Sequence, residues 1–421
     1  MAVTALSHVY PLGSRLNEAG RLEVGGCDTV ELAREFGTPA YVMAEYDLRA
    51  RARTFREALA THHGDDGEVV FASKAFPCTA AYRLFAQEDL ACDAATGGEL
   101  HLALQGGFEP ARIYLHGNAK SERELREGIE AGVGHIVIDN FDDIDRLEAL
   151  VPAGGGQPVL VRVRPGVKPS THDFISTGQL DSKFGLALDD ARAAIERLRG
   201  SDRLDLRGLH MHIGSQIFEL GSFRQAVEAI AGLGEFPVYD LGGGLGVAYT
   251  AEDEPPAIEA YVQAKATAVR EILGAGKRLV IEPGRALVAN AGVTLYTVET
   301  VKRDVSTYVA VDGGMSDNLR PMLYGARYEA AIADRPDAPG TQIATVAGMH
   351  CESGDVLARD VTLAAPRPGD LLVMPATGAY GHAMANNYNG IPRPPVIFCS
   401  GGEAREVVRR ETYEDLTLRD L

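Results

Sequence analysis

Short apolar runs alternate with amphipathic segments through the middle of the chain. Eight of these runs have the length and β-branched content of buried strands, and they cover residues 69–72, 90–93, 113–115, 135–138, 159–163, 206–212, 238–241 and 279–282. Segments with helical periodicity lie between them, for example over residues 79–87, 121–131 and 189–199. This alternation predicts an α/β fold with a parallel sheet and helical crossovers. Eight units in roughly 220 residues match the size of a (β/α)8 TIM barrel, and an open doubly wound sheet is the alternative.

The pattern changes after about residue 292. Short β segments separated by Gly and Pro turns predict a second, mostly β domain, and they cover 293–301, 307–312, 343–348, 370–374, 395–399 and 406–409. The first residues are hairpin-like, with a helical stretch over 29–36. We therefore expect three regions: an N-terminal segment (1–39) that packs on the β domain, a (β/α)8 barrel (40–291), and a C-terminal β domain (292–421).

Charge and cysteine content narrow the function classes. The chain has 421 residues and a net charge of −18. This charge argues against nucleic-acid binding, which depends on Lys and Arg neutralising phosphates, and against an anionic membrane surface, although a small anion needs only a local pocket. The five cysteines are scattered without a C-x-x-C pair, and no His/Asp/Glu cluster has ligand spacing, so neither a metal nor a disulfide framework is expected. No signal peptide is evident, which favours the cytoplasm.

Polar residues follow the carboxyl ends of the predicted barrel strands. They are Lys74, Asp93, His116, Asp139, His212, the glycines at 242–244, and Glu282. A TIM barrel gathers these ends at one mouth, where active sites are built. Each residue taken alone fits an ordinary turn, whereas the whole set indicates an active site.

Three barrel motifs carry distinct chemistry. Lys74 ends an apolar strand between Ala72 and Ala75, where partial desolvation would favour a nucleophilic, Schiff-base-forming amine. Period-2 alternation places His210 and His212 on the same side of a strand, either as hydrogen-bonded core residues or with one imidazole against an aromatic ligand. Ser215 follows in a turn that could bind an anion.

Two further barrel motifs point to an anionic, nitrogen-containing ligand. The Gly242-Gly243-Gly244 turn can direct backbone N–H groups to a phosphate, or it is only a turn. In Glu282-Pro283-Gly284-Arg285 the carboxylate could pair with a protonated ring nitrogen and the arginine could bind a carboxylate or phosphate. The alternative is a local ion pair at the barrel rim.

The predicted β domain contains a second group of candidates. Most free cysteines are inert core residues, but Cys351 lies between His350 and Glu352 and is a candidate for an acid/base thiol. Arg320 and Tyr324 add a cation and a phenol, and Tyr380 adds another phenol. A lysine amine, an acid, a flat imidazole, a glycine turn and arginines are together what pyridoxal 5'-phosphate (PLP) requires.

The chain resembles the fold-type III, alanine-racemase-like PLP enzymes, and among them the diaminopimelate decarboxylase family. The resemblance extends from about Thr38 to the C-terminus, and its motifs occur in the family's order: Phe71-Ala72-Ser73-Lys74-Ala75, His212-Ile213-Gly214-Ser215-Gln216, Gly242-Gly243-Gly244, Glu282-Pro283-Gly284-Arg285, Cys351-Glu352-Ser353-Gly354-Asp355 and Gly378-Ala379-Tyr380-Gly381. Met211 and the segment His382–Asn387 depart from the usual pattern. Neither departure touches an implied catalytic position, although the second could alter the pocket wall.

The resemblance implies a role for each matching residue. Lys74 would bind the PLP aldehyde, His212 would stack on the ring and Glu282 would pair with its nitrogen. The remaining cofactor contacts would come from Asp93, Ser215, Gly243, Gly244, Gly284, Arg285 and Tyr380. Substrate would be bound by Arg285, Arg320, Tyr324, Glu352 and Tyr380. Cys351 would be the proton donor, contributed across a homodimer interface.

The implied reaction is decarboxylation of meso-2,6-diaminopimelate at its D centre to L-lysine and CO2, the last step of lysine biosynthesis. A decarboxylase of ornithine, arginine, lysine or carboxynorspermidine is an alternative, but Arg320 and Glu352 argue against it. A racemase or a non-catalytic PLP-binding relative are the others, and Lys74, Cys351 and the β domain argue against the last. Residues 170–183 are a candidate for a loop that closes over the site.

Overall fold

The computed structural model describes residues 6–167 and 182–421. It divides into two compact units. The barrel unit comprises Arg51–Gly246 and Pro255–Ala286, and the β unit comprises Met1–Ala50, Val247–Glu254 and Leu287–Leu421. The candidate closing loop at 170–183 lies outside the described residues except for its last two positions.

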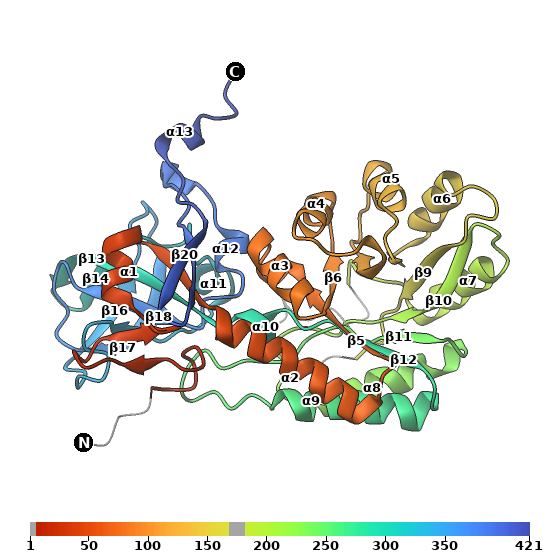
Figure 1. Cartoon of the computed structure of the whole chain (residues 1–421), viewed down its shortest axis with the longest axis horizontal. Coiled ribbons are helices and arrows are strands. Elements are labelled where there is room, and N and C mark those ends of the chain that lie inside the picture. Colours follow the sequence, from red (N-terminus) through yellow and green to blue (C-terminus); the bar gives the residue numbers. More distant parts are fainter. Residues whose placement is uncertain (1–5, 168–181) are drawn as a thin grey trace. The chain divides into compact units, whose positions relative to one another are not determined.

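Eight parallel strands close into the barrel predicted from the sequence. Their order around the barrel is β10-β11-β12-β5-β6-β7-β8-β9, and Figure 1 labels several of these strands together with the helices around them. The strands are β5 (Gly67–Ala72), β6 (Ala91–Ala94), β7 (Ile113–Leu115), β8 (His135–Ile138), β9 (Gln157–Arg162), β10 (Leu204–His210), β11 (Val238–Asp240) and β12 (Arg278–Ile281). The barrel closes because β12 pairs with β5 in parallel register, so the open doubly wound sheet is excluded.

Helices connect the strands on the outside of the barrel. They are α3 (Thr79–Gln87), α4 (Gly97–Gln105), α5 (Glu122–Ala131), α6 (Phe141–Leu150), α7 (Leu188–Arg199), α8 (Gly221–Ile230) and α9 (Ile258–Ala268), and α2 (Glu45–His63) precedes the first barrel strand, β5. Local sequence sets their ends. For example, α5 begins at a capping box between Ser121 and Glu124 and ends at left-handed Gly132.

The barrel interior is filled by side chains from seven of the eight strands. The cluster contains Val70, Ala91, Tyr114, Val137, Leu160, Val238 and Val280. The remaining strand, β10, contributes Gly208 at its close approach to β11, where an added Cβ would lie 1.9 Å from the Val238 carbonyl oxygen. A filled interior leaves the carboxyl ends of the strands as the place for a ligand site.

The β unit is built around one large sheet. Its strands run in the order β17-β16-β14-β13-β4-β19-β20, with β18 pairing with β13 and with β15. They are β4 (Ala40–Ala44), β13 (Gly292–Arg303), β14 (Thr307–Val311), β15 (Ala331–Ile332), β16 (Gln342–Ala347), β17 (Val356–Leu363), β18 (Leu371–Pro375), β19 (Val396–Ser400) and β20 (Glu403–Val408). Short helices complete the unit: α10 (Arg285–Val288) at the boundary, α11 (Arg320–Tyr324), α12 (Gly381–Met384) and α13 (Tyr413–Leu416).

The N-terminal segment packs on this sheet, as expected. It consists of β1 (Arg15–Leu16), β2 (Leu22–Val24), β3 (Cys27–Asp28) and α1 (Thr29–Phe36). Leu22 and Leu32 share one buried cluster with Val293 and Ile397 of the sheet.

Strand β4 differs from the sequence-based boundaries. The sequence pattern placed everything from residue 40 in the barrel, whereas β4 pairs with β13 and β19 in the β unit. The two units therefore divide after Ala50 rather than after residue 39. The reason is that β4 is buried along its whole length, so its apolar sequence fits a barrel strand and an interior sheet strand equally well.

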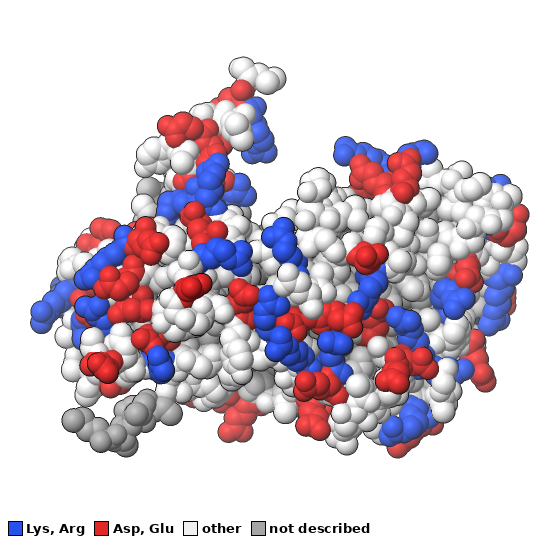
Figure 2. All heavy atoms as spheres, in the orientation of Figure 1, with Lys and Arg blue, Asp and Glu red and all other residues white. Residues whose placement is uncertain are grey.

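Charged side chains of both signs are interspersed on the face shown in Figure 2. Within residues 6–167 and 182–421, no helix combines the length and the apolar character needed to cross a membrane.

Candidate active site

Glu282 is the central acid at the mouth of the barrel. It directly follows β12 and is 6% exposed. Its two carboxylate oxygens contact two imidazoles: Oε1 lies 2.8 Å from His116 Nε2, and Oε2 lies 3.2 Å from His210 Nε2. Burial acts to raise the pKa of Glu282, but the two histidines outweigh it and hold the pKa well below its usual range. Glu282 is therefore a carboxylate.

Asp240 ends the neighbouring strand β11 and is fully buried. Burial, together with the charge of Glu282, raises the pKa of Asp240 well above its usual range. The pKa values of these two adjacent acids are therefore shifted in opposite directions.

His212 is held by the glycine turn that follows β11. The Gly243 N–H donates to His212 Nδ1 over 3.2 Å, which leaves the proton of a neutral imidazole on Nε2. Burial lowers the pKa of His212 well below its usual range, and the charges of Lys74 and Arg162 add to this effect. A neutral, oriented imidazole can lie flat against an aromatic ring. His210, by contrast, is occupied by Glu282, and burial lowers its pKa to about 3.

Lys74 lies in a 3-10 turn, Ser73–Ala75, directly after β5. Asp93 of the next strand fixes this turn by accepting the Ser73 N–H over 2.8 Å. Burial raises the pKa of Asp93 to about 6, against the lowering effect of the Lys74 charge. Lys74 is an exposed residue, whereas the flanking Ala72 and Ala75 are buried in the core.

Ser215 and Arg285 meet beside the glycine turn. Arg285 donates to Ser215 Oγ from Nε over 3.2 Å and from Nη2 over 2.9 Å. The turns approach closely here: a Cβ on Gly243 would lie 2.2 Å from the Glu282 carbonyl oxygen, and one on Gly284 would lie 2.8 Å from Ala72 Cβ. Glycine is therefore required at both positions for the backbone to form this cradle.

No His, Asp or Glu cluster has metal-ligand spacing along the sequence, but the fold brings four such residues together. His116, His210, Asp240 and Glu282 come from four different strand ends, yet offer ligand atoms that all lie within 4.8 Å of one another. Spacing along the chain cannot reveal such a cluster. Both oxygens of Glu282 already contact imidazoles.

The β unit holds the second group of predicted residues. Arg320 begins α11 and is 6% exposed. Its guanidinium lies 4.5 Å from the centre of the Tyr249 ring, and its Nη1 donates to the hydroxyl of Tyr328. Tyr324 ends the same helix and is half-buried. Tyr380 directly precedes α12. Its φ of 64° lies in the left-handed region, which is strained for a residue other than glycine and fixes the direction in which its side chain leaves the backbone.

Cys351 and Glu352 form a turn held by the segment η6 (Tyr388–Gly390). Cys351 is the exposed member of the five free cysteines, and its N–H donates to Asn389 Oδ1 over 3.2 Å. The Tyr388 hydroxyl donates to Glu352 Oε1 over 2.5 Å. The Tyr388 ring also stacks on His350, with ring planes 3° apart. Neither Tyr388 nor Asn389 was singled out from the sequence.

His350 is fixed in turn by Asp355. Its Nδ1 lies 2.8 Å from Asp355 Oδ2, which also accepts the His350 N–H over 2.9 Å. The other oxygen of Asp355 accepts the Met315 N–H over 2.7 Å. The turn that carries Cys351 and Glu352 is therefore held on one side by Asp355, through His350, and on the other side by η6.

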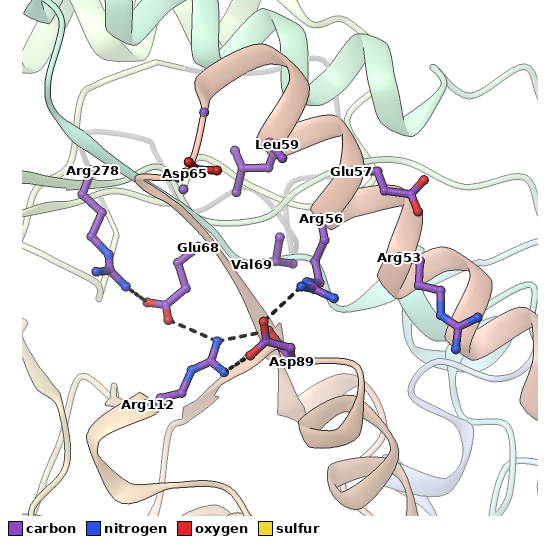
Figure 3. Close-up of a pocket in the computed structure, with 13 residues that line it drawn as sticks. Arg53, Arg56, Glu57, Leu59, Asp65, Glu68, Val69, Asp89, Arg112 and Arg278 are labelled. Carbon is purple, nitrogen blue, oxygen red and sulfur yellow. Dashed lines mark hydrogen bonds and ion pairs between the residues drawn. The ribbon is translucent and has the colours of Figure 1, made fainter.

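A cavity of about 480 Å³ lies at the opposite, amino-terminal ends of the barrel strands. Figure 3 shows Arg56, Arg112 and Arg278 facing carboxylates: Arg112 contacts both Asp89 and Glu68, Arg278 contacts Glu68, and Arg56 contacts Asp89. The cavity is lined by four arginines and four acidic residues, so the charges of its lining balance. It does not contain the residues described above.

Three comparisons place the chain among known proteins. Residues 45–289, more than half of the chain, match the family model described as the pyridoxal binding domain of pyridoxal-dependent decarboxylases. The chain is 46% identical to the diaminopimelate decarboxylase of Bacillus subtilis (strain 168) over 97% of each sequence. The chain belongs to the diaminopimelate decarboxylase family.

Solved structures of this family agree with that assignment. The chain is similar, with a TM-score of 0.91 and 31% identity over 99% of both chains, to the diaminopimelate decarboxylase of M. jannaschii in complex with L-lysine. It is also similar to the Helicobacter pylori enzyme complexed with L-lysine, with a TM-score of 0.86 and 28% identity over 93% of this chain. The resemblance inferred from the sequence motifs, the barrel fold, the decarboxylase class and the PLP cofactor are thereby confirmed.

The barrel residues suit PLP on chemical grounds as well. Glu282 is a carboxylate in a buried setting, as a protonated ring nitrogen requires. His212 offers a neutral ring, and Lys74 offers the amine of an exposed residue. The turns around Gly243 and Ser215 offer backbone N–H groups and a hydroxyl group for the phosphate. The sequence had left His116 unassigned, and its strand-end position was the only signal for it.

Proposed function

We propose that this chain removes the D-centre carboxylate of meso-2,6-diaminopimelate to give L-lysine and CO2, as a homodimer in the cytoplasm. The observation that carries the proposal is the 46% identity to a diaminopimelate decarboxylase over nearly the whole of both sequences. The arrangement around Glu282 supports it independently, because a carboxylate flanked by two imidazoles suits a decarboxylase that uses PLP.

Within the barrel unit each residue has a defined task. When bound, PLP supplies an electron sink for the electron pair left behind by the departing CO2. Lys74 would be the amine that holds the cofactor covalently. Glu282 would keep a proton on the ring nitrogen, since a carboxylate with a low pKa does not compete for that proton. His212 would lie against the ring, while Asp93 holds the Lys74 turn through the Ser73 N–H.

Phosphate binding would fall to the turns at the barrel mouth. Gly243, Gly244 and Gly284 let the backbone approach an anion closely. Ser215 and Arg285 add a hydroxyl and a guanidinium that are already paired with each other. The phenol of Tyr380 would add a further donor.

Substrate recognition explains the arginines. Diaminopimelate keeps one carboxylate and one ammonium at its distal end, so it requires a cation and an anion there. Arg320 and Arg285, with Tyr324, would bind the carboxylate, and Glu352 would bind the ammonium. An ornithine or lysine decarboxylase meets only a distal ammonium, for which two arginines would be unfavourable.

Cys351 would donate the proton to Cα from the partner subunit. Cys351 is exposed, as is required of a thiol that acts in the active site of the partner subunit. Its fixed backbone, bonded to Asn389, would aim the side chain.

The test is a substrate panel with purified enzyme. We expect CO2 from meso-diaminopimelate, with chiral analysis giving L-lysine, and none from L-lysine, L-ornithine, L-arginine or carboxynorspermidine. Lys74→Ala serves as the negative control, and CO2 from that variant would reveal contamination. Release of CO2 from one of the other substrates, inversion of an amino acid without CO2, or PLP binding with no turnover would each contradict the proposal.

A further inference from the structure

Lys265 is a fully buried lysine that the reaction described above does not use. It lies on α9 and is 0% exposed. Its Nζ donates to three successive carbonyl oxygens of the glycine turn: Leu241 over 2.9 Å, Gly242 over 2.6 Å and Gly243 over 3.2 Å. A buried cation is costly unless it is fully hydrogen-bonded, so these contacts are not incidental to the fold.

Further groups complete the environment of this ammonium. Nζ lies 2.6 Å from the Tyr261 hydroxyl and stands over the rings of Tyr261 and Phe223, at 4.4 and 4.6 Å from their centres. Burial lowers the pKa of Lys265 to about 7, while the charges of Asp240 and Glu282 act to raise it. The three carbonyl oxygens that accept from Nζ favour its charged form.

The geometry of the peptide bond turns these contacts into an orienting device. In a trans peptide the C=O of one residue and the N–H of the next point in opposite directions. Lys265 draws the Leu241 carbonyl to itself, and the Gly242 N–H then donates to Asp240 Oδ1 over 2.9 Å. It draws the Gly242 carbonyl, and the Gly243 N–H then donates to His212 Nδ1.

The third peptide completes the pattern. The Gly243 carbonyl faces Lys265, so the N–H of Gly244 points to the opposite side of the turn. That is the side on which a phosphate would find it. One ammonium therefore binds the carbonyls of three amide groups, with the Glu282 N–H also donating to the Gly242 carbonyl over 3.0 Å. Of the three N–H groups, one holds an acid, one holds the histidine, and one remains for the anion.

We propose that Lys265 is a positioning residue that orients the glycine turn for PLP phosphate and fixes the His212 ring. It acts through the peptide groups and does not touch the cofactor. The proposal rests on the assignment of the phosphate to this turn, so the experiment must separate the two.

The experiment compares Lys265→Met with the wild-type holoenzyme. Methionine keeps the length and the apolar stem but removes the charge and all three carbonyl contacts. We expect PLP to leave the variant holoenzyme about tenfold faster or more, as suits the loss of hydrogen bonds to a charged group. We also expect the 31P NMR signal of bound PLP to shift, which a purely structural role would not cause.

Lys120→Met is a matched control. Lys120 is another buried barrel lysine, 3% exposed, whose Nζ donates to the carbonyls of Gly117 and Val137 and pairs with Asp143. Its loss should lower the unfolding midpoint but leave PLP release and the 31P signal unchanged. An equal change in both lysine variants would mean that general destabilisation explains the effect, and would overturn the proposal.

Two further variants keep the question decidable. If Lys265→Met does not fold, Tyr261→Phe removes only the hydroxyl that contacts Lys265, and a smaller change in the same direction is expected. Ser215→Ala tests the phosphate site itself. If Ser215→Ala speeds PLP release while Lys265→Met and Tyr261→Phe do not, the Lys265 proposal fails alone. If none of the three changes release or the 31P signal, the phosphate assignment fails with it.

Discussion

Buried carboxyl groups in this protein are tuned in opposite directions by their partners. Glu282 is kept ionised by two imidazoles. Asp317 of the β unit, 1% exposed, is not: burial raises its pKa to about 7, and the nearby Asp355 and Asp312 add to the effect. The Tyr296 hydroxyl and the Gly314 N–H donate to it but do not offset the burial.

This difference predicts a pH dependence of stability. Folded Asp317 keeps its proton up to about pH 7, whereas the unfolded chain releases it near 3.8. The folded state therefore binds more protons between these values, so the stability contributed by Asp317 is complete at low pH and is lost as pH rises to about 7. Asn cannot titrate. From pH 4 to pH 7.5 we expect the wild type to lose about 4 kcal/mol of unfolding free energy relative to Asp317→Asn.

Urea unfolding of both proteins at several pH values measures this difference. Parallel curves for wild type and Asp317→Asn would show that Asp317 is ionised throughout. The Glu411→Gln variant is a useful comparison with the opposite sign, because hydrogen bonds from Arg393 and Asn387 lower the pKa of Glu411 to about 2 against the effect of its burial.

The sequence singles out residues with recognisable chemistry but gives no sign of Lys265, which we propose acts through the glycine turn. Lys74, His212 and Glu282 follow strand ends, a position that indicates function. Lys265 lies in α9, and nothing in the sequence of this helix indicates that its amine reaches the loop after β11. Its role depends on a packing distance between α9 and the barrel, which a linear pattern does not contain.

At the level of elements, η6 acts on the turn that carries Cys351 and Glu352. Tyr388 contacts the turn twice, by stacking on His350 and by hydrogen bonding to Glu352. Asn389 has φ of 55°, a left-handed conformation that Asn tolerates better than most residues. This short element therefore sets the orientation of a carboxylate that we assign to the distal ammonium of the substrate.

Tyr388→Phe should separate binding from chemistry. The ring and its stacking on His350 remain, but Glu352 loses a hydrogen bond. We expect KM for diaminopimelate to rise by up to about tenfold with kcat changed much less. Tyr413→Phe is the control, since Tyr413 is 76% exposed and should behave as wild type. An unchanged KM in Tyr388→Phe would remove Glu352 or its orientation from substrate recognition.

Most elements were predictable because their patterns are local. The helix over 29–36 matches α1, and all eight barrel strands fall where apolar runs predicted them. Strand β17, Val356–Leu363, was missed because Arg359, Asp360 and Thr362 break its apolar pattern on an exposed face. Pairing partners were not predictable for β4, since a buried strand carries no mark of which sheet receives it.

For the whole molecule, the proposed homodimer makes a quantitative prediction. If Cys351 serves the Lys74 of its partner, Lys74→Ala and Cys351→Ala are each nearly inactive as pure dimers. Mixed dimers would then contain one intact site. Random exchange makes half of the dimers mixed, so activity should recover to about a quarter of the wild-type value, following the two-fold symmetry of such an interface.

The measurement is turnover after co-refolding or subunit exchange of equal amounts of the two variants. Cys351→Ala should still retain PLP, as judged by its absorbance band, whereas Lys74→Ala should lose the covalent band. No recovery in a mixture shown to contain mixed dimers would mean that each chain supplies its own cysteine.

The placement of β4 bears on how such a chain can be made. Its neighbours in the sheet, β13 and β19, are synthesised about 250 and 350 residues later, after the complete barrel unit. During translation β4 therefore emerges before both of its partner strands. Until they are synthesised, its apolar side chains are not buried in the sheet and both of its backbone edges are unpaired. A fragment that begins after β4 would leave β13 and β19 as unpaired neighbours. The β unit is thus one domain interrupted by another, and it cannot be expressed as a continuous C-terminal piece without losing an interior strand.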